Sequence, residues 1–113
     1  MPFINIKTNA AVTPEKAQAV KAALGEAIRT IPGKSEQWLM VGIEPDYTLY
    51  FQGTDAPAAM VQVSIYGSAS SAAYDTLTGK ICDILTDTLD IPALRTYVAY
   101  QETPNWGWNG GNF

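Results

Sequence analysis

Hydrophobic and polar residues alternate at the start of the chain, where Ile4 and Ile6 fall on one face of residues 2–8. A period of two is typical of a half-buried strand, so a strand is predicted here. Four later segments have the length and composition of further strands: residues 38–43, 48–51, 60–66 and 96–101. The tail, residues 103–113, is predicted to be a loop with at most a short edge strand.

Two stretches between these strands place hydrophobic residues three and four positions apart, which is the spacing of an amphipathic helix. The first is predicted to start with Thr13 as its N-cap and Pro14 at the first helical position. The second is predicted to follow a serine cap, Ser70 or Ser71, and both helices are expected to end just before a proline. The inner face of the second helix is expected to carry Leu77, Ile81, Ile84, Leu85 and Leu89.

The order of elements predicts an α+β fold with a β-α-β-β-α-β pseudo-repeat. Right-handed crossovers would place both helices on one face of a four-stranded mixed sheet. The other face would mix apolar with polar side chains: Phe3, Met40, Met60, Tyr66 and Tyr97 beside Asn5, Gln62 and Ser64. Such a face is too apolar to be left wholly in water. We therefore expect the single domain, residues 1–113, to assemble as an oligomer that packs these faces together.

The composition argues against several classes of function. The chain has net charge −4 and no basic cluster, so neither nucleic acid nor a membrane is an expected partner. It has no histidine and one cysteine, Cys82, so we expect no imidazole catalysis, metal site or internal disulfide. No cofactor is predicted. The first residues lack the pattern of a signal peptide, which favours a cytoplasmic location and leaves open secretion without such a signal.

Several short motifs stand in a characteristic order along the chain. They are Met1-Pro2 leading into a strand, Gly33-Lys34 after the first helix, Arg95-Thr96-Tyr97-Val98, and Trp106-Gly107-Trp108-Asn109-Gly110 before a final Phe113. Asn9, Phe51-Gln52-Gly53-Thr54 and Tyr66-Gly67 add to the pattern. Together they resemble the macrophage migration inhibitory factor family of the tautomerase superfamily. The resemblance implies a homotrimer with sites at subunit boundaries, and keto–enol tautomerase activity on arylpyruvates such as phenylpyruvate.

Pro2 is the catalytic residue that the resemblance implies. Removal of Met1 would leave Pro2 with a free secondary amine, and an ordinary α-amino group has a pKa of about 7.7–8.0. Burial among apolar side chains or a nearby lysine would lower that pKa, leaving a neutral amine that can act as general base. If Met1 is retained, Pro2 is an amide without a basic nitrogen, and the protein should be nearly inactive.

The resemblance also implies the contacts of an aryl α-keto acid substrate. Lys34 and the backbone amide of Tyr66 would bind its carboxylate, and Tyr97 of a neighbouring subunit would donate a hydrogen bond to its carbonyl or enol oxygen. The aromatic walls would be Phe3, Trp38, Trp106, Trp108 and Phe113. Position alone also allows simpler roles, with Lys34 as a solvated lysine after a helix and Tyr97 as a packing residue.

The chain departs from the family pattern in several places. The Cys-x-x-Cys of some members is replaced by Ala58 and Val61, so a thiol oxidoreductase is not expected, and Cys82 is expected to be structural. Ala99 stands where the vertebrate cytokine has an asparagine, which puts recognition of a phenolic hydroxyl in doubt. Two alternatives to the enzyme stay open. One is a cytokine-like interaction protein that acts on a host receptor if secreted, and the other is a purely structural trimer.

Overall fold

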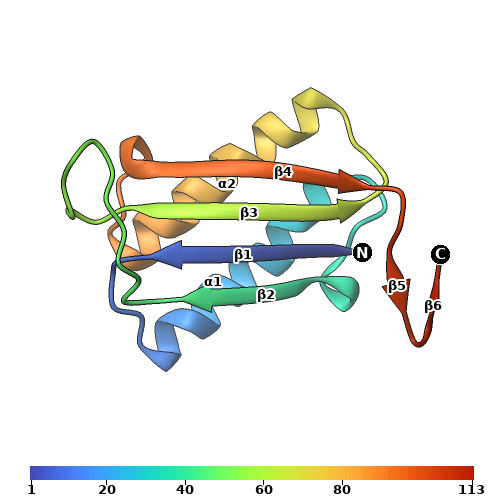
Figure 1. Cartoon of the computed structure of the whole chain (residues 1–113), viewed down its shortest axis with the longest axis horizontal. Helices are drawn as coiled ribbons and strands as arrows, with labels where there is room; N and C mark the ends of the chain where they lie inside the picture. The colour runs from blue at the N-terminus through green and yellow to red at the C-terminus, as the bar shows by residue number, and fades with distance from the viewer.

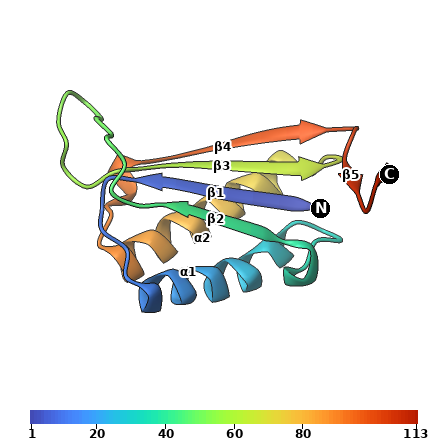
Figure 2. The ribbon, with the colours of Figure 1, turned by 60° about the horizontal axis from the view of Figure 1, so that its bottom comes forward.

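Two helices lie side by side on one face of a four-stranded sheet in the computed structural model, which describes residues 1–113 (Figures 1 and 2). The strands are β1 (Pro2–Thr8), β2 (Met40–Glu44), β3 (Ala59–Tyr66) and β4 (Thr96–Thr103), and the helices are α1 (Pro14–Ala27) and α2 (Ser71–Leu89). The sheet order is β2-β1-β3-β4. β1 is parallel to β2, β3 is parallel to β4, and β1 is antiparallel to β3. The predicted α+β fold with a mixed sheet is confirmed.

Side-chain caps define where both helices begin. The Thr13 hydroxyl accepts a hydrogen bond from the Lys16 N–H at 3.2 Å, and Pro14 follows at the first helical position. The Ser70 hydroxyl accepts from the Ala73 N–H at 3.1 Å, which makes Ser70, not Ser71, the cap of α2. These bonds satisfy backbone donors that have no partner within the helix.

The core lies between the sheet and the two helices. Alternate residues of β1 and β3 are fully buried against the inner stripes of the helices. The largest of these side chains are Ile4, Ile6, Val61, Ile65, Val20, Leu24, Ile28, Leu77, Ile81 and Leu85. The outer strands contribute half-buried residues such as Val41, Ile43 and Val98. Ile84 was expected in the inner stripe but is only half-buried, because it borders the outer groove between the helices.

Three expected elements differ from the structure. β2 begins at Met40, because Glu36–Trp38 forms a 3₁₀ turn and removes Trp38 from the strand. The strand predicted at residues 48–51 is wrong. Only a single bridge, Phe51 to Thr54, forms there, and the segment joins no strand of the sheet. The tail folds into a hairpin instead of an open loop.

The C-terminal hairpin joins β5 (Gly107–Trp108) to β6 (Gly111–Asn112). Asn109 and Gly110 form its turn with φ values of +53° and +87°. An Asn-Gly pair with two positive φ angles matches the twist of a tight hairpin, since both residues tolerate the left-handed region.

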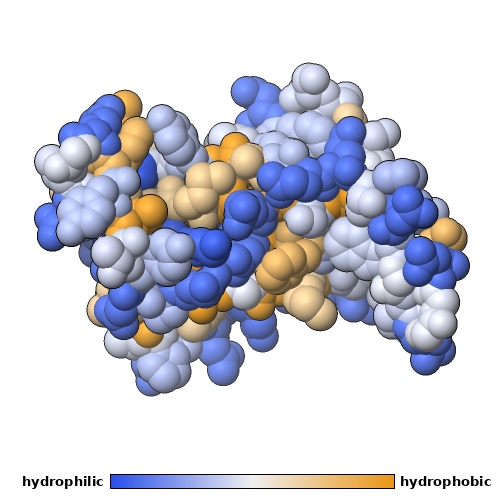
Figure 3. Space-filling model, viewed as in Figure 1, coloured by the Kyte–Doolittle hydropathy of each residue, from blue (hydrophilic) through white to orange (hydrophobic).

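The second face of the sheet carries no helix. Figure 3 views this face and shows hydrophobic and hydrophilic areas interleaved across it. Met40 and Tyr97 are 67% and 60% exposed, and the Asn5 amide donates to the Glu44 carboxylate at 2.9 Å between them on the same surface. This is the mixed composition that predicts an oligomer.

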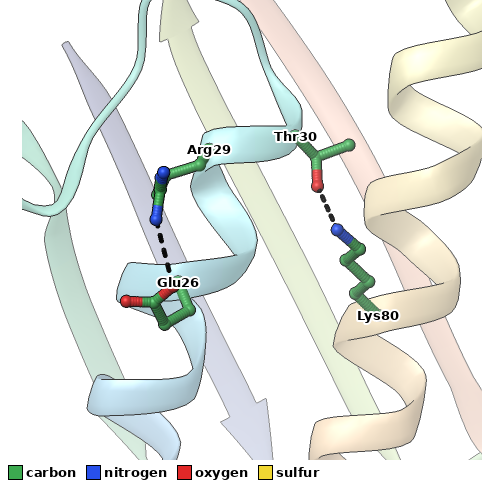
Figure 4. A network of polar contacts seen from close by, with 4 residues as sticks. All are labelled: Glu26, Arg29, Thr30 and Lys80. Carbon is green, nitrogen blue, oxygen red and sulfur yellow. Dashed lines mark hydrogen bonds and ion pairs between the residues drawn. The ribbon is translucent and has the colours of Figure 1, made fainter.

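Two polar contacts lie at the outer surface of the helices, and one of them crosses from one helix to the other (Figure 4). The Lys80 ammonium on α2 donates to the Thr30 hydroxyl, just after α1, at 2.8 Å, and Arg29 pairs with Glu26 at 3.4 Å. Exposed ion pairs of this kind contribute at most about 1 kcal/mol, so the apolar contacts beneath them hold the helices together. Neither helix combines the length and apolar character needed to cross a membrane.

Leucine truncation tests the location of the core. Leu85→Ala should lower the free energy of unfolding by about 2–5 kcal/mol, because Leu85 is fully buried. The matched variant Leu94→Ala should change it by less than about 0.5 kcal/mol, because Leu94 is 90% exposed. Urea denaturation at one protein concentration measures both. Equal effects would contradict the described packing.

Candidate active site

The register between β1 and β3 fixes the surroundings of the N-terminus. Pro2 pairs with Ile65, one residue before the end of β3, and the Met1 carbonyl accepts a hydrogen bond from the Tyr66 N–H at 3.0 Å. Pro2 itself is buried on the helix side of the sheet. The first residues of the chain therefore lie at an edge of the core and not in open solvent.

Lys34 reaches the N-terminus from the loop that follows α1. We call the region where Met1, Pro2, Lys34 and Tyr66 meet the N-terminal corner. Gly33 adopts φ +80°, which turns the chain after the 3₁₀ turn Ile28–Thr30, and the Lys34 N–H donates to the Ile31 carbonyl at 3.1 Å. The Lys34 ammonium then donates to the Tyr66 carbonyl at 2.9 Å. Tyr66 thus has both backbone groups engaged, its N–H by Met1 and its carbonyl by Lys34. The sequence predicted Lys34 and the Tyr66 amide, but gave no signal for the role of the Tyr66 carbonyl.

This corner disfavours a second positive charge. Burial is the largest of three causes that together lower the pKa of the Met1 amine from 8.0 to about 6; the other two are the nearby Lys34 cation and the hydrogen bond with its side chain. An amine at this position is therefore largely neutral at pH 7. In a chain without histidine, such an amine is a suitable general base.

Aromatic rings from three segments line the corner. Trp38 meets Trp108 edge-on with ring centroids 5.2 Å apart, and Trp108 is stacked with Phe113 at 6.2 Å. Phe113 also lies 5.5 Å from the Tyr66 ring. Trp106 supports this group through its backbone, since its carbonyl accepts from the Phe113 N–H at 3.0 Å. The hairpin therefore presents an aromatic wall next to Lys34 and the N-terminus.

Two of the predicted site residues lie apart from this group. Phe3 faces the helix-free side of the sheet, because its neighbours Pro2 and Ile4 point to the buried side. Tyr97 pairs with Met60 at the opposite end of β3. At about 3.3 Å per strand residue, Tyr97 and Pro2 of one chain are roughly 16 Å apart along the sheet. One chain alone does not bring Tyr97 to the N-terminal corner.

Tyr97 has a small apolar pocket of its own. Its ring lies 4.8 Å from that of Phe51, beside a cavity of about 170 Å³. The cavity is lined mainly by hydrophobic side chains, with the Arg95 guanidinium as the one charged group. The motifs Phe51-Gln52-Gly53-Thr54 and Arg95-Thr96-Tyr97-Val98, separate in the sequence, are neighbours here.

Comparison with known proteins finds one family over the whole chain. Residues 1–113 match the family model described as macrophage migration inhibitory factor (MIF). The macrophage migration inhibitory factors of Xenopus laevis and Mus musculus are each 30% identical to this chain, over all of it and 99% of their own length. The crystal structure of Leishmania major MIF2 superposes with a TM-score of 0.94 and 34% identity, covering 100% of this chain and 97% of the other.

Titration of the α-amine tests the electrostatics of the corner. In the chain that retains Met1, the amine should become reactive toward an acylating reagent with a midpoint near pH 6, measured by peptide mass spectrometry. The folded state then binds fewer protons than the unfolded state between about pH 6 and pH 8, so stability should rise with pH over this interval.

Lys34→Gln should move the midpoint upward, because it removes the neighbouring positive charge. Lys21→Gln, on the exposed surface of α1, is the matched control and should leave the midpoint unchanged. A midpoint near 8 in the unsubstituted chain would show that the amine is fully hydrated.

Proposed function

Because this chain belongs to the macrophage migration inhibitory factor family of the tautomerase superfamily, we propose that it is a keto–enol tautomerase of aryl α-keto acids such as phenylpyruvate. The observation that carries the proposal is the shared corner of the N-terminal amine, the Lys34 ammonium and the Tyr66 N–H. These are an amine, a cation and a neutral donor within one partly buried site.

Removal of Met1 would change two features of the site at once. It would convert Pro2 from an amide into a secondary amine, and it would free the Tyr66 N–H that the Met1 carbonyl occupies. A substrate carboxylate oxygen resembles that carbonyl oxygen as a hydrogen-bond acceptor. One carboxylate oxygen would then bind the Tyr66 N–H and the other the Lys34 ammonium, while the aryl ring packs against Trp108 and Phe113.

The chemistry requires one proton to leave carbon and one to reach oxygen. The neutral Pro2 nitrogen takes a proton from the carbon next to the carbonyl, and the C–H electron pair becomes the C=C bond of the enol. The carbonyl π pair moves onto oxygen, which takes its proton from solvent, and the protonated Pro2 amine then releases its proton to solvent. Lys34 stabilises the charge that develops along this path, and the reverse sequence converts enol to ketone.

In the proposed mechanism, Tyr97 acts on the substrate bound at a neighbouring subunit. Its hydroxyl would donate to the carbonyl oxygen, but in its own chain Tyr97 lies at the far end of the sheet from Pro2. A homotrimer in which the Tyr97 end of one chain meets the Pro2 end of the next would complete three sites. The uncovered, mixed face of the sheet supports such assembly.

An interaction role is the second candidate. It is favoured by the names of the relatives, which describe inhibition of macrophage migration. In that case the pocket would be secondary, and a trimer with Pro2→Gly would still bind its receptor while losing tautomerisation. A flat activity profile across arylpyruvates would favour a purely structural trimer over the enzyme.

Replacement of the proposed base tests the enzyme directly. Pro2→Gly, with Met1 removal verified by intact mass, should lower kcat/KM for phenylpyruvate by about 10²–10⁴-fold, because Gly alters the pKa, nucleophilicity and placement of the amine. Loss of enol absorbance measures the rate. Pro14→Ala, at the first position of α1, is the proline control and should retain full activity. Unchanged turnover in Pro2→Gly would remove Pro2 from the mechanism.

Retention of Met1 provides an independent test that leaves Pro2 in place. A preparation in which Met1 is kept should be nearly inactive, because the Pro2 nitrogen is then an amide, the Met1 amine lies one residue away from it, and the Tyr66 N–H is already bonded. Full activity in a preparation whose mass shows complete Met1 retention would contradict the role of the Pro2 nitrogen as base and that of the Tyr66 N–H as a donor to the carboxylate.

Sedimentation tests the shared site. At micromolar concentration the protein should sediment at about three times its chain mass of 12.2 kDa. A stable monomer with full activity would show that Tyr97 of a neighbouring subunit is not needed.

A further inference from the structure

The loop between β2 and β3 is held from one side by Asn9, which directly follows β1. The Asn9 amide nitrogen donates to the carbonyls of Leu49, Asp55 and Ala56 at 3.2, 3.0 and 3.0 Å. Its side-chain oxygen accepts from the Ala58 N–H at 2.9 Å. A single side chain thus fixes both ends of the loop by four hydrogen bonds.

Arg95 holds the same loop from the other side, directly before β4. Its guanidinium donates to the carbonyls of Thr54, Ala56 and Pro57 at 3.2, 3.1 and 3.0 Å. The same group lies 5.3 Å from the centre of the Phe51 ring. A planar guanidinium can reach several carbonyls and lie against a ring at once, and a lysine ammonium cannot reproduce this arrangement.

Phe51 transmits the geometry of the loop to Tyr97. The two rings lie 4.8 Å apart at an angle of 60°, and reciprocal backbone hydrogen bonds of 2.9 and 3.1 Å tie Phe51 to Thr54, a residue that Arg95 also binds. Tyr97 is 60% exposed, and its ring is in contact with the Phe51 ring. The loop and Phe51 are therefore what orients an otherwise exposed ring.

We propose that Arg95 and Asn9 are positioning residues for the tautomerase reaction. They hold the loop so that Phe51 fixes the Tyr97 ring, and the Tyr97 hydroxyl is then presented to the site of the neighbouring subunit. This inference rests on the proposed function, in which Tyr97 donates to the substrate oxygen. Neither positioning side chain contacts substrate, because their donors are directed at backbone carbonyls.

Arg95→Lys is the primary test, since it keeps the positive charge and removes the planar guanidinium with its several donors. It should lower kcat for phenylpyruvate about tenfold with little change in KM, because Lys34 and the Tyr66 N–H still bind the carboxylate and only the oxygen donor is misplaced. The matched control is Arg29→Lys in the 3₁₀ turn Ile28–Thr30, whose guanidinium makes one exposed ion pair with Glu26 and should leave both parameters unchanged.

A double-mutant cycle separates positioning from general damage. Tyr97→Phe removes the hydroxyl, so Arg95→Lys should have no further effect in the Tyr97→Phe background. If Arg95→Lys lowers kcat by the same factor in both backgrounds, Arg95 does not act through Tyr97 and the proposal is overturned. Phe51→Leu removes the ring between the loop and Tyr97 and should give the same kcat loss as Arg95→Lys. This variant replaces Arg95→Lys in the cycle if the arginine variant does not assemble.

A spectroscopic readout keeps this test independent of catalysis. In protein with ring-labelled tyrosine, the Tyr97 signal is identified by its loss in Tyr97→Phe. Arg95→Lys should shift or broaden that signal, and Arg29→Lys should not. An unmoved signal would refute the positioning role. If the signal moves but neither Pro2→Gly nor Tyr97→Phe lowers activity, the failure belongs to the proposed function and not to the contact between the loop and Tyr97.

Discussion

The antiparallel register of β1 against β3 is the constraint on which the site depends. It places Pro2 opposite Ile65 and Met1 beside Tyr66, at one end of the two central strands of the sheet. β2 is parallel to β1, and β4 is parallel to β3. The segment before β2 and the segment after β4 therefore lie at this same end of the sheet. Lys34, Trp38 and the C-terminal hairpin are thereby gathered around the N-terminus. A slip of one residue would turn Pro2 to the helix-free face and disperse the group.

The corner combines two opposed electrostatic requirements. In the proposed function, binding of a carboxylate would need a positive charge, which Lys34 would supply, and proton transfer would need a neutral amine close to it. Partial burial and the Lys34 cation both favour the neutral form of the Met1 amine, so the residue that would bind the carboxylate also lowers the pKa of the amine next to it. Tyr66 has a similar double role, because its carbonyl anchors Lys34 while its N–H is the donor available to an oxygen ligand.

Much of the fold could be predicted from local pattern, because its main signals are short-range. The alternation of Ile4 and Ile6 and the spacing of Leu77, Ile81 and Leu85 each identify a buried face, and all five are fully buried. The strand predicted at residues 48–51 was wrong because strand propensity does not reveal whether the segment pairs with another strand. The hairpin turn at Asn109-Gly110 carried the right signal but lay in a tail interpreted as a loop.

Most of the residues that gather at the N-terminal corner were predicted to lie together, but their geometry could not be predicted. Lys34, Tyr66, Trp38, Trp108 and Phe113 do meet, whereas Phe3 and Tyr97 lie elsewhere in the chain. Contacts such as that of Lys34 with the Tyr66 carbonyl depend on strand order and register, which no local sequence pattern specifies. The same holds for Asn9 and Arg95, which converge on one loop from opposite ends of the chain.

The most direct measurement is the ¹⁵N chemical shift of the Pro2 nitrogen across pH in protein from which Met1 has been removed. The account predicts that this nitrogen titrates well below the ordinary α-amino range of about 7.7–8.0, with a midpoint that matches the acidic limb of kcat/KM. A Pro2 nitrogen that stays protonated throughout the active pH range would contradict the account.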